Sequence, residues 1–199
     1  MKKFGKPELG YTGGQIEEEL FAEVNRPLRL TFEQWLKNRD KFRMSKSEMF
    51  RLIKENQPAA PTTPDTDFAY DTQSEIVELL QKEEEFSEVD YNDLLSRVKF
   101  FTAVNSPLDY GLGIDAFFEI YLDDEHFIRI TLDAAGWEKG DYKADILIVY
   151  PEEGIDPKED KKDWKKFIQD QAQFIVEKFK SKLKNHEVER TRGNIKKAV

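Results

Sequence analysis

The sequence predicts an α+β fold, in which a small, mostly antiparallel sheet of three strands is flanked by helices. Three observations lead to this prediction. Apolar and polar residues alternate through residues 114–121 and 127–133, with an acidic turn between them, which is the pattern of a β-hairpin. Residues 144–150 form a third run, rich in β-branched residues. Apolar residues elsewhere recur mostly at helical spacing, so helices are expected to cover the sheet.

The register of the hairpin decides which side chains share a face. An odd loop, of three residues at 123–125 or of five, pairs Asp115 with Asp133 and creates one wholly apolar face, whereas a two-residue loop would pair Asp115 with Leu132 and mix the faces. We therefore expect the odd loop, with the β-carbons of Asp115 and Asp133 about 4.5–5.5 Å apart. The expected apolar face carries Ile114, Ala116, Phe118, Ile120, Ile128, Ile130 and Leu132.

Capping patterns predict where helices begin. Thr31, Ser45 and Thr72 are each followed three residues later by Glu or Gln, which is the arrangement of a capping box. Asp90 is expected to open a further helix that continues past residue 98 toward Ser106. A last long helix is predicted over residues 158–183, followed by a frayed tail.

A proline-rich segment divides the chain. Residues 56–67 contain three prolines and show no periodicity, so they are interpreted as a linker. The predicted organisation is an N-terminal helical arm with this linker (1–64) and an α+β domain (65–199). The arm carries a short helix near 15–24 and an apolar helical stripe, which needs a partner surface. That surface is either the chain's own domain or another copy, in a homo-oligomer or larger assembly.

Composition excludes several classes of protein. The 199 residues are 36% charged and contain no cysteine, which excludes disulfides and thiolate metal sites. No apolar run approaches the roughly 20 residues of a membrane span, and the basic N-terminus lacks the apolar region of a signal peptide. We therefore expect a cytoplasmic protein with no membrane partner. With only two histidines, a metal would be a hard cation held by oxygen atoms.

The net charge of −9 is unevenly distributed. Residues 178–199 contain eight Lys or Arg against two acids, while residues 65–95 contain eleven acids and one lysine. Net charge thus argues against nucleic-acid binding by the whole surface, but not by the basic tail. The predicted phosphate contacts are Lys180, Lys184, Arg190 and Arg192. The alternative is a solvated helix end, where cations suit the helix dipole.

Four acidic residues lie on or at the ends of the predicted strands: Asp115, Glu119, Asp133 and Asp145. Carboxylates that converge on one point can bind Mg²⁺, and like charges placed opposite one another require a cation, a proton or the nearby Arg129. Asp115, Asp133 and Glu119 are therefore predicted metal ligands. The alternative interpretation is an ordinary solvated face of the sheet.

A predicted helix is followed by a hairpin with an early acidic residue and a second acidic residue at the end of its second strand. This order resembles the core of the PD-(D/E)xK nuclease superfamily. The residues that carry the resemblance are G-x-D at 113–115 and the acid that ends I-T-L-D at 130–133. The resemblance implies a Mg²⁺-dependent nuclease acting on DNA phosphodiesters, with Asp115 and Asp133 as ligands. It also implies an assisting acid on the preceding helix, either Glu88 or Asp93.

The chain departs from the superfamily pattern at one position. The superfamily has a lysine two residues after the second acid, whereas this chain has Ala135. Lys139 or Lys143 would have to supply the amine, so the predicted catalytic residues are Asp115, Asp133, Lys139 and Lys143. Otherwise the site is catalytically degenerate. The alternative function is a noncatalytic interaction or assembly protein, whose N-terminal arm docks on a partner or on another copy.

Overall fold

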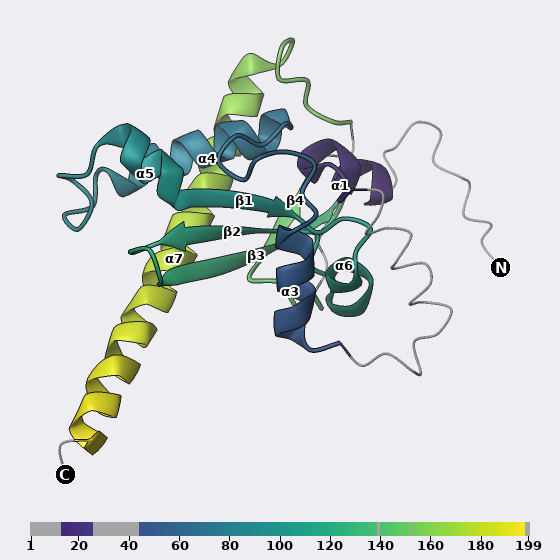
Figure 1. Cartoon of the computed structure of the whole chain (residues 1–199). Coiled ribbons are helices and arrows are strands. Elements are labelled where there is room, and N and C mark those ends of the chain that lie inside the picture. Colours follow the sequence, from purple (N-terminus) through teal and green to yellow (C-terminus); the bar gives the residue numbers. More distant parts are fainter. Residues whose placement is uncertain (1–12, 26–43, 139, 152, 198–199) are drawn as a thin grey trace.

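The computed structural model describes residues 13–25, 44–138, 140–151 and 153–197, with side chains of the last helix described as far as residue 185. A four-stranded sheet has helices on both of its faces (Figure 1). The helices are α1 (Gly13–Phe21), α3 (Lys46–Lys54), α4 (Asp67–Leu80), α5 (Tyr91–Arg97), α6 (Pro107–Leu112) and α7 (Lys161–Lys197). The strands are β1 (Val98–Thr102), β2 (Ala116–Tyr121), β3 (Phe127–Ala135) and β4 (Ile146–Val149).

The sheet confirms the α+β class and corrects its details. The strand order is β1-β2-β3-β4, and β1, β2 and β3 are antiparallel neighbours. Strand β4 runs parallel to β3, so the sheet is mixed. The prediction of three strands was wrong because β1 was taken as the end of a helix.

Strand β1 shows how a helical pattern misled the prediction. Asp90 does cap a helix, since its side chain accepts hydrogen bonds from the backbone of Asn92 and Asp93, but α5 ends at Arg97. Val98 and Phe101 are spaced as on one face of a helix. In the structure they lie on opposite sides of a strand, in different apolar clusters. Pairing with β2 therefore overrides the local preference.

The hairpin has the predicted register. Phe118 pairs with Ile130 and Tyr121 with Phe127, and the ladder continues to Ala116 opposite Leu132. Asp115 lies just beyond it, and its backbone N–H donates to the carbonyl of Leu132 at 2.9 Å, so the predicted pairing of Asp115 with Asp133 is not part of the ladder. Five residues, 122–126, connect the paired strands. The carboxylate of Asp123 accepts hydrogen bonds from the backbone of Glu125 and His126 at 2.9 and 2.8 Å, and these bonds hold its pKa down at about 2.

Both faces of the sheet are covered (Figure 1). The predicted apolar face packs against α4 and α7 in the main core; Ile114 alone departs from it, because it lies with the α6 side chains in the second cluster. That second cluster is formed on the other face by residues of α3 and α6, including Phe50 and Ile53, around Phe117. Phe117 and Glu119 are fully buried. The alternative of a solvated sheet face is therefore wrong.

The capping predictions had mixed outcomes. Ser45 and Glu48 form the predicted capping box at the start of α3. Thr72 does not begin a helix: α4 begins earlier, with Thr66 as its N-cap, and Thr72 is buried within it. Thr31 lies outside the described residues. Both Ser45 and Thr66 precede their helices in extended conformation, which is the usual geometry of an N-cap.

The helices before the linker lie against the chain's own sheet. Ile16 and Leu20 of α1 belong to the main core, and Phe50 and Ile53 of α3 belong to the second cluster. The division at residue 64 and docking of the arm on a partner stay predictions. Helix α7 is longer than expected and carries charged residues throughout. Among the described helices, none combines the length and apolar character needed to cross a bilayer.

Candidate metal centre

A tight turn places two aspartates at the start of β2. Ser106 caps α6, and Pro107 occupies its first turn. Gly113 ends the helix in the left-handed conformation, with φ of 59°, and its N–H donates to the carbonyl of Asp109 at 2.7 Å. A residue with a β-carbon is disfavoured there. The chain thereby reverses between Asp109 and Asp115, so both carboxylates lie at one end of the sheet.

Helix α1 brings a third carboxylate to this end. Carboxylate oxygens of Glu17, Asp109 and Asp115 all lie within 4.8 Å of one another. Asp133 lies near the end of β3, and its charge acts on both aspartates. We call these four residues, Glu17, Asp109, Asp115 and Asp133, the acidic cluster.

Asp115 is the most strongly perturbed member of the acidic cluster. Its side chain is nearly buried, and its Oδ2 atom accepts a hydrogen bond from the backbone N–H of Ala134 at 2.8 Å. Burial raises the pKa of Asp115 to about 8, and the charges of Glu17, Asp109 and Asp133 act in the same direction. The hydrogen bond only partly offsets them. An uncharged form is therefore favoured at neutral pH unless a cation is bound.

Asp109 is held by the turn that precedes α6. Its Oδ2 atom accepts the N–H of Asn105 at 2.8 Å, and Asn105 has a left-handed φ of 62°. Asn105 is fixed in turn by its side-chain bond to Glu23 at 2.9 Å. Burial raises the pKa of Asp109 to about 6, with a smaller contribution from Asp133. Asp109 thus needs a counter-charge near neutral pH, as Asp115 does.

The structure does not bring Glu119 to the acidic cluster. Glu119 lies four residues beyond Asp115 along the strand, a separation of about 13 Å. Its Oε2 atom accepts a hydrogen bond from Lys54 at 2.7 Å, and its Oε1 atom accepts one from Arg129 at 3.0 Å. Its role as a metal ligand stays a prediction, which the geometry does not favour.

The remaining predicted catalytic groups lie between β3 and β4. Lys143 is exposed, and Lys139 lies outside the described residues. Asp145 accepts hydrogen bonds from the backbone and hydroxyl of Thr131, both at 2.9 Å, and from Lys182. Burial opposes ionisation of Asp145, but these bonds prevail and lower its pKa. Asp145 is therefore a structural link between β3, β4 and α7.

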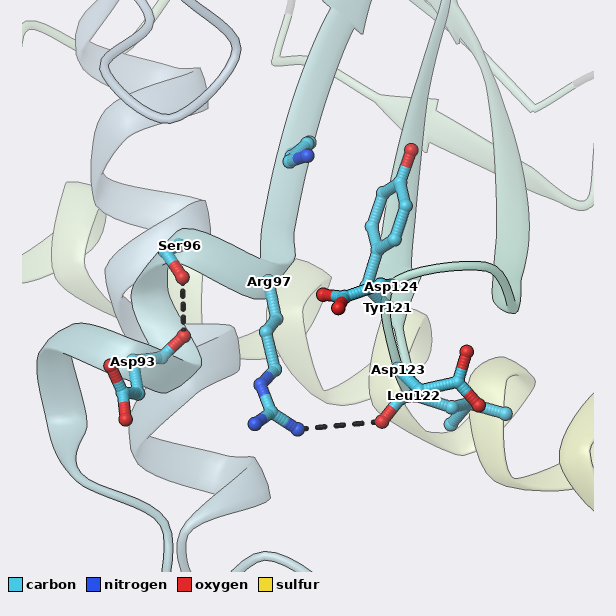
Figure 2. Close-up of a pocket in the computed structure, with 8 residues that line it drawn as sticks. Asp93, Ser96, Arg97, Tyr121, Leu122, Asp123 and Asp124 are labelled. Carbon is cyan, nitrogen blue, oxygen red and sulfur yellow. Dashed lines mark hydrogen bonds between the residues drawn. The ribbon is translucent and has the colours of Figure 1, made fainter.

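The assisting acid suggested by the resemblance, either Glu88 or Asp93, stays a prediction. Asp93 lines a cavity of about 490 Å³ at the hairpin end of the sheet, and Glu88 is exposed. Figure 2 shows Asp93 and Arg97 on α5, and the guanidinium of Arg97 donates to the carbonyl of Leu122 in the hairpin at 3.4 Å. The cavity lies beside Tyr121, about 20 Å along β2 from Asp115.

The predicted phosphate contacts on α7 are only partly described. Lys180 forms an ion pair with Glu83 at 2.8 Å, and Lys184 lines a small cavity beside the same acidic turn. The side chains of Arg190 and Arg192 lie outside the described residues. The helix continues beyond the hairpin end of the sheet, away from α1 and α6 (Figure 1).

Sequence reasoning missed two members of the acidic cluster, Glu17 and Asp109. Asp109 follows a Ser-Pro helix start and precedes a glycine, so a short helix could have been predicted there. Glu17 lies in an acidic helix whose docking position depends on tertiary packing. Comparisons of this chain with family models, curated proteins and solved structures find no match.

Proposed function

We propose that this protein is a divalent-cation-dependent phosphodiester hydrolase acting on DNA, with its centre at the acidic cluster. The observation that carries the proposal is the convergence of Glu17, Asp109 and Asp115 oxygens within 4.8 Å, with the charge of Asp133 acting on both aspartates. The resemblance to the PD-(D/E)xK core supports it. The resembling residues, Asp115 and Asp133, are two members of the cluster.

The donor set fits Mg²⁺ or Mn²⁺. All members are carboxylates, and hard divalent cations prefer oxygen ligands. One oxygen of Asp115 and one of Asp109 accept backbone hydrogen bonds, which orient both side chains. Glu17, Asp109 and Asp115 would hold the cation, with Asp133 adding negative charge beside them. When bound, such a cation neutralises charge on a phosphoryl oxygen and lowers the pKa of a coordinated water.

The protein's own groups supply positioning and charge. The bond from Ala134 to Asp115 fixes that carboxylate against β3, and Asn105 fixes Asp109 against the turn. Burial of Asp115 and Asp133 excludes water, which strengthens electrostatic interactions with a bound substrate. In the proposed mechanism, an amine beside the scissile phosphate comes from Lys143 or from Lys139. Of these two, Lys143 is the one whose position the structure describes.

Cleavage of plasmid DNA tests the catalytic part of this proposal. We expect the full chain to nick or linearise plasmid with Mg²⁺ or Mn²⁺ and to be inactive in EDTA. Asp115→Asn and Asp133→Asn should each lower the rate by at least about 100-fold, because each removes one charge that would hold the cation.

Asp123→Asn is the matched control, since Asp123 is an exposed aspartate at the opposite end of β2. It should cleave at the wild-type rate. Cleavage that survives Asp133→Asn would contradict the site, and absence of cleavage with every cation would contradict the catalytic function.

A further inference from the structure

A basic cavity lies beside α3. Its volume is about 520 Å³, and it opens between α3 and the first residues of β3. Three cations line it, namely Arg51, Lys54 and Arg129, together with the rings of Phe50 and Phe127 and one carboxylate, Glu55. In a chain with a net charge of −9, such a concentration of positive charge is unusual.

A buried carboxylate holds two of these cations. Glu119 is fully buried, and it accepts hydrogen bonds from Lys54 at 2.7 Å and from Arg129 at 3.0 Å. The side chains of Lys54 and Arg129 remain 30% and 24% exposed. Because one carboxylate serves two cations, positive charge is left over at the cavity wall.

The guanidinium of Arg129 is fixed in orientation. Its Nε and Nη2 atoms both donate to Glu119, and its central carbon lies 3.7 Å from the centre of the Phe50 ring. Its Nη1 atom donates to no group among the described residues. An arginine held in this way offers its free N–H donors to a planar or tetrahedral oxyanion with little loss of conformational entropy.

Arg51 adds a third, more exposed charge at the rim. It pairs with Glu55 one helical turn away at 3.1 Å, and 70% of its side chain is exposed. Such an exposed pair contributes little to stability. Arg51 can therefore turn toward an anion in the cavity without loss of a structural contact.

We propose that this cavity binds a phosphate group through Arg129 and Lys54, with Arg51 at its rim. The phosphate belongs either to a nucleic-acid backbone or to a free nucleotide, both of which could place a base against Phe127. A purely structural ion pair between α3 and the sheet would need only one cation for Glu119. The proposal does not depend on the acidic cluster, which lies about 13 Å away along β2.

Isothermal titration in EDTA tests this site while keeping the acidic cluster free of metal. The probes are inorganic phosphate, a nucleoside monophosphate and a short single-stranded oligonucleotide, each titrated into the full chain. Ser47 lines the cavity and is exposed, so Ser47→Glu places a negative charge there without removing a core contact. We expect it to weaken binding by about tenfold or more.

Ser181→Glu is the matched control, because it adds the same charge on an exposed position of α7. It should bind the probes as the wild type does, while Arg51→Gln should weaken binding in the same direction as Ser47→Glu. Tighter binding of the oligonucleotide than of the monophosphate would identify a backbone as the source of the phosphate, and the reverse a nucleotide. Absence of saturable binding by all probes, or equal effects of Ser47→Glu and Ser181→Glu, would overturn the proposal.

Discussion

Replacement of Glu119 by Gln is expected to lower the free energy of unfolding by about 3 kcal/mol, because it leaves two cations without their carboxylate. Glu119 is fully buried and serves both Lys54 and Arg129. Removing one partner of a buried ion pair usually costs about 3–5 kcal/mol. We expect the lower end of that range, because both cations are partly exposed and can turn toward water.

Urea unfolding at constant pH measures this loss. Glu55→Gln is the control: Glu55 pairs with Arg51 at the surface, so its loss should change stability by less than about 0.5 kcal/mol. Adding Lys54→Met to Glu119→Gln should recover part of the loss, since one unpaired charge is removed. Equal stability of Glu119→Gln and Glu55→Gln would show that the buried ion pairs do not hold α3 on the sheet.

Replacement of Asp115 by Asn is expected to stabilise the metal-free protein at pH 9 but not at pH 4. The pKa of Asp115 is about 8 in the folded protein against an ordinary value of 3.8. Between these values the folded state retains a proton that the unfolded state has lost. Stability of the wild type therefore falls as pH rises through this window and is lowest above pH 8.

The size of this effect follows from the shift in the pKa of Asp115. A shift of this size corresponds to about 6 kcal/mol at most above pH 8, and Asn avoids the cost because it carries no charge. Its side-chain oxygen can still accept the N–H of Ala134. Urea unfolding in EDTA at pH 4 and pH 9 provides the test.

Asp123→Asn should behave in the opposite way. Backbone hydrogen bonds from Glu125 and His126 hold the pKa of Asp123 at about 2, so its ionised form favours the folded state above its ordinary pKa. We therefore expect no gain in stability at pH 9 for Asp123→Asn. An identical change in stability for Asp115→Asn at both pH values would contradict the raised pKa of Asp115.

The hairpin was predictable because its information is local. Apolar alternation selects one register, and the structure confirms it from Ala116 opposite Leu132 to Tyr121 opposite Phe127. Ser45 likewise caps α3 through a bond to a residue only three positions away. In both cases the deciding contacts are short-range or follow from a single repeating pattern.

The rest of the candidate site depends on packing between distant segments. Glu17 reaches Asp115 only because α1 docks beside β3, and no sequence pattern specifies that position. Burial of the polar sheet face by α3 has no signal in the sequence either, so the ion pairs of Glu119 with Lys54 and Arg129 could not be predicted. Strand β1 was missed because its spacing also suits a helix.

Titration of the full chain with Mn²⁺ or Mg²⁺ at pH 8, followed by calorimetry, tests most directly whether the acidic cluster holds a divalent cation. We predict saturable binding by the wild type and by Asp123→Asn, accompanied by proton release because the pKa of Asp115 is about 8. Asp115→Asn should lose this binding. Absence of saturable binding by the wild type, or equal binding by Asp115→Asn and Asp123→Asn, would contradict the proposed centre.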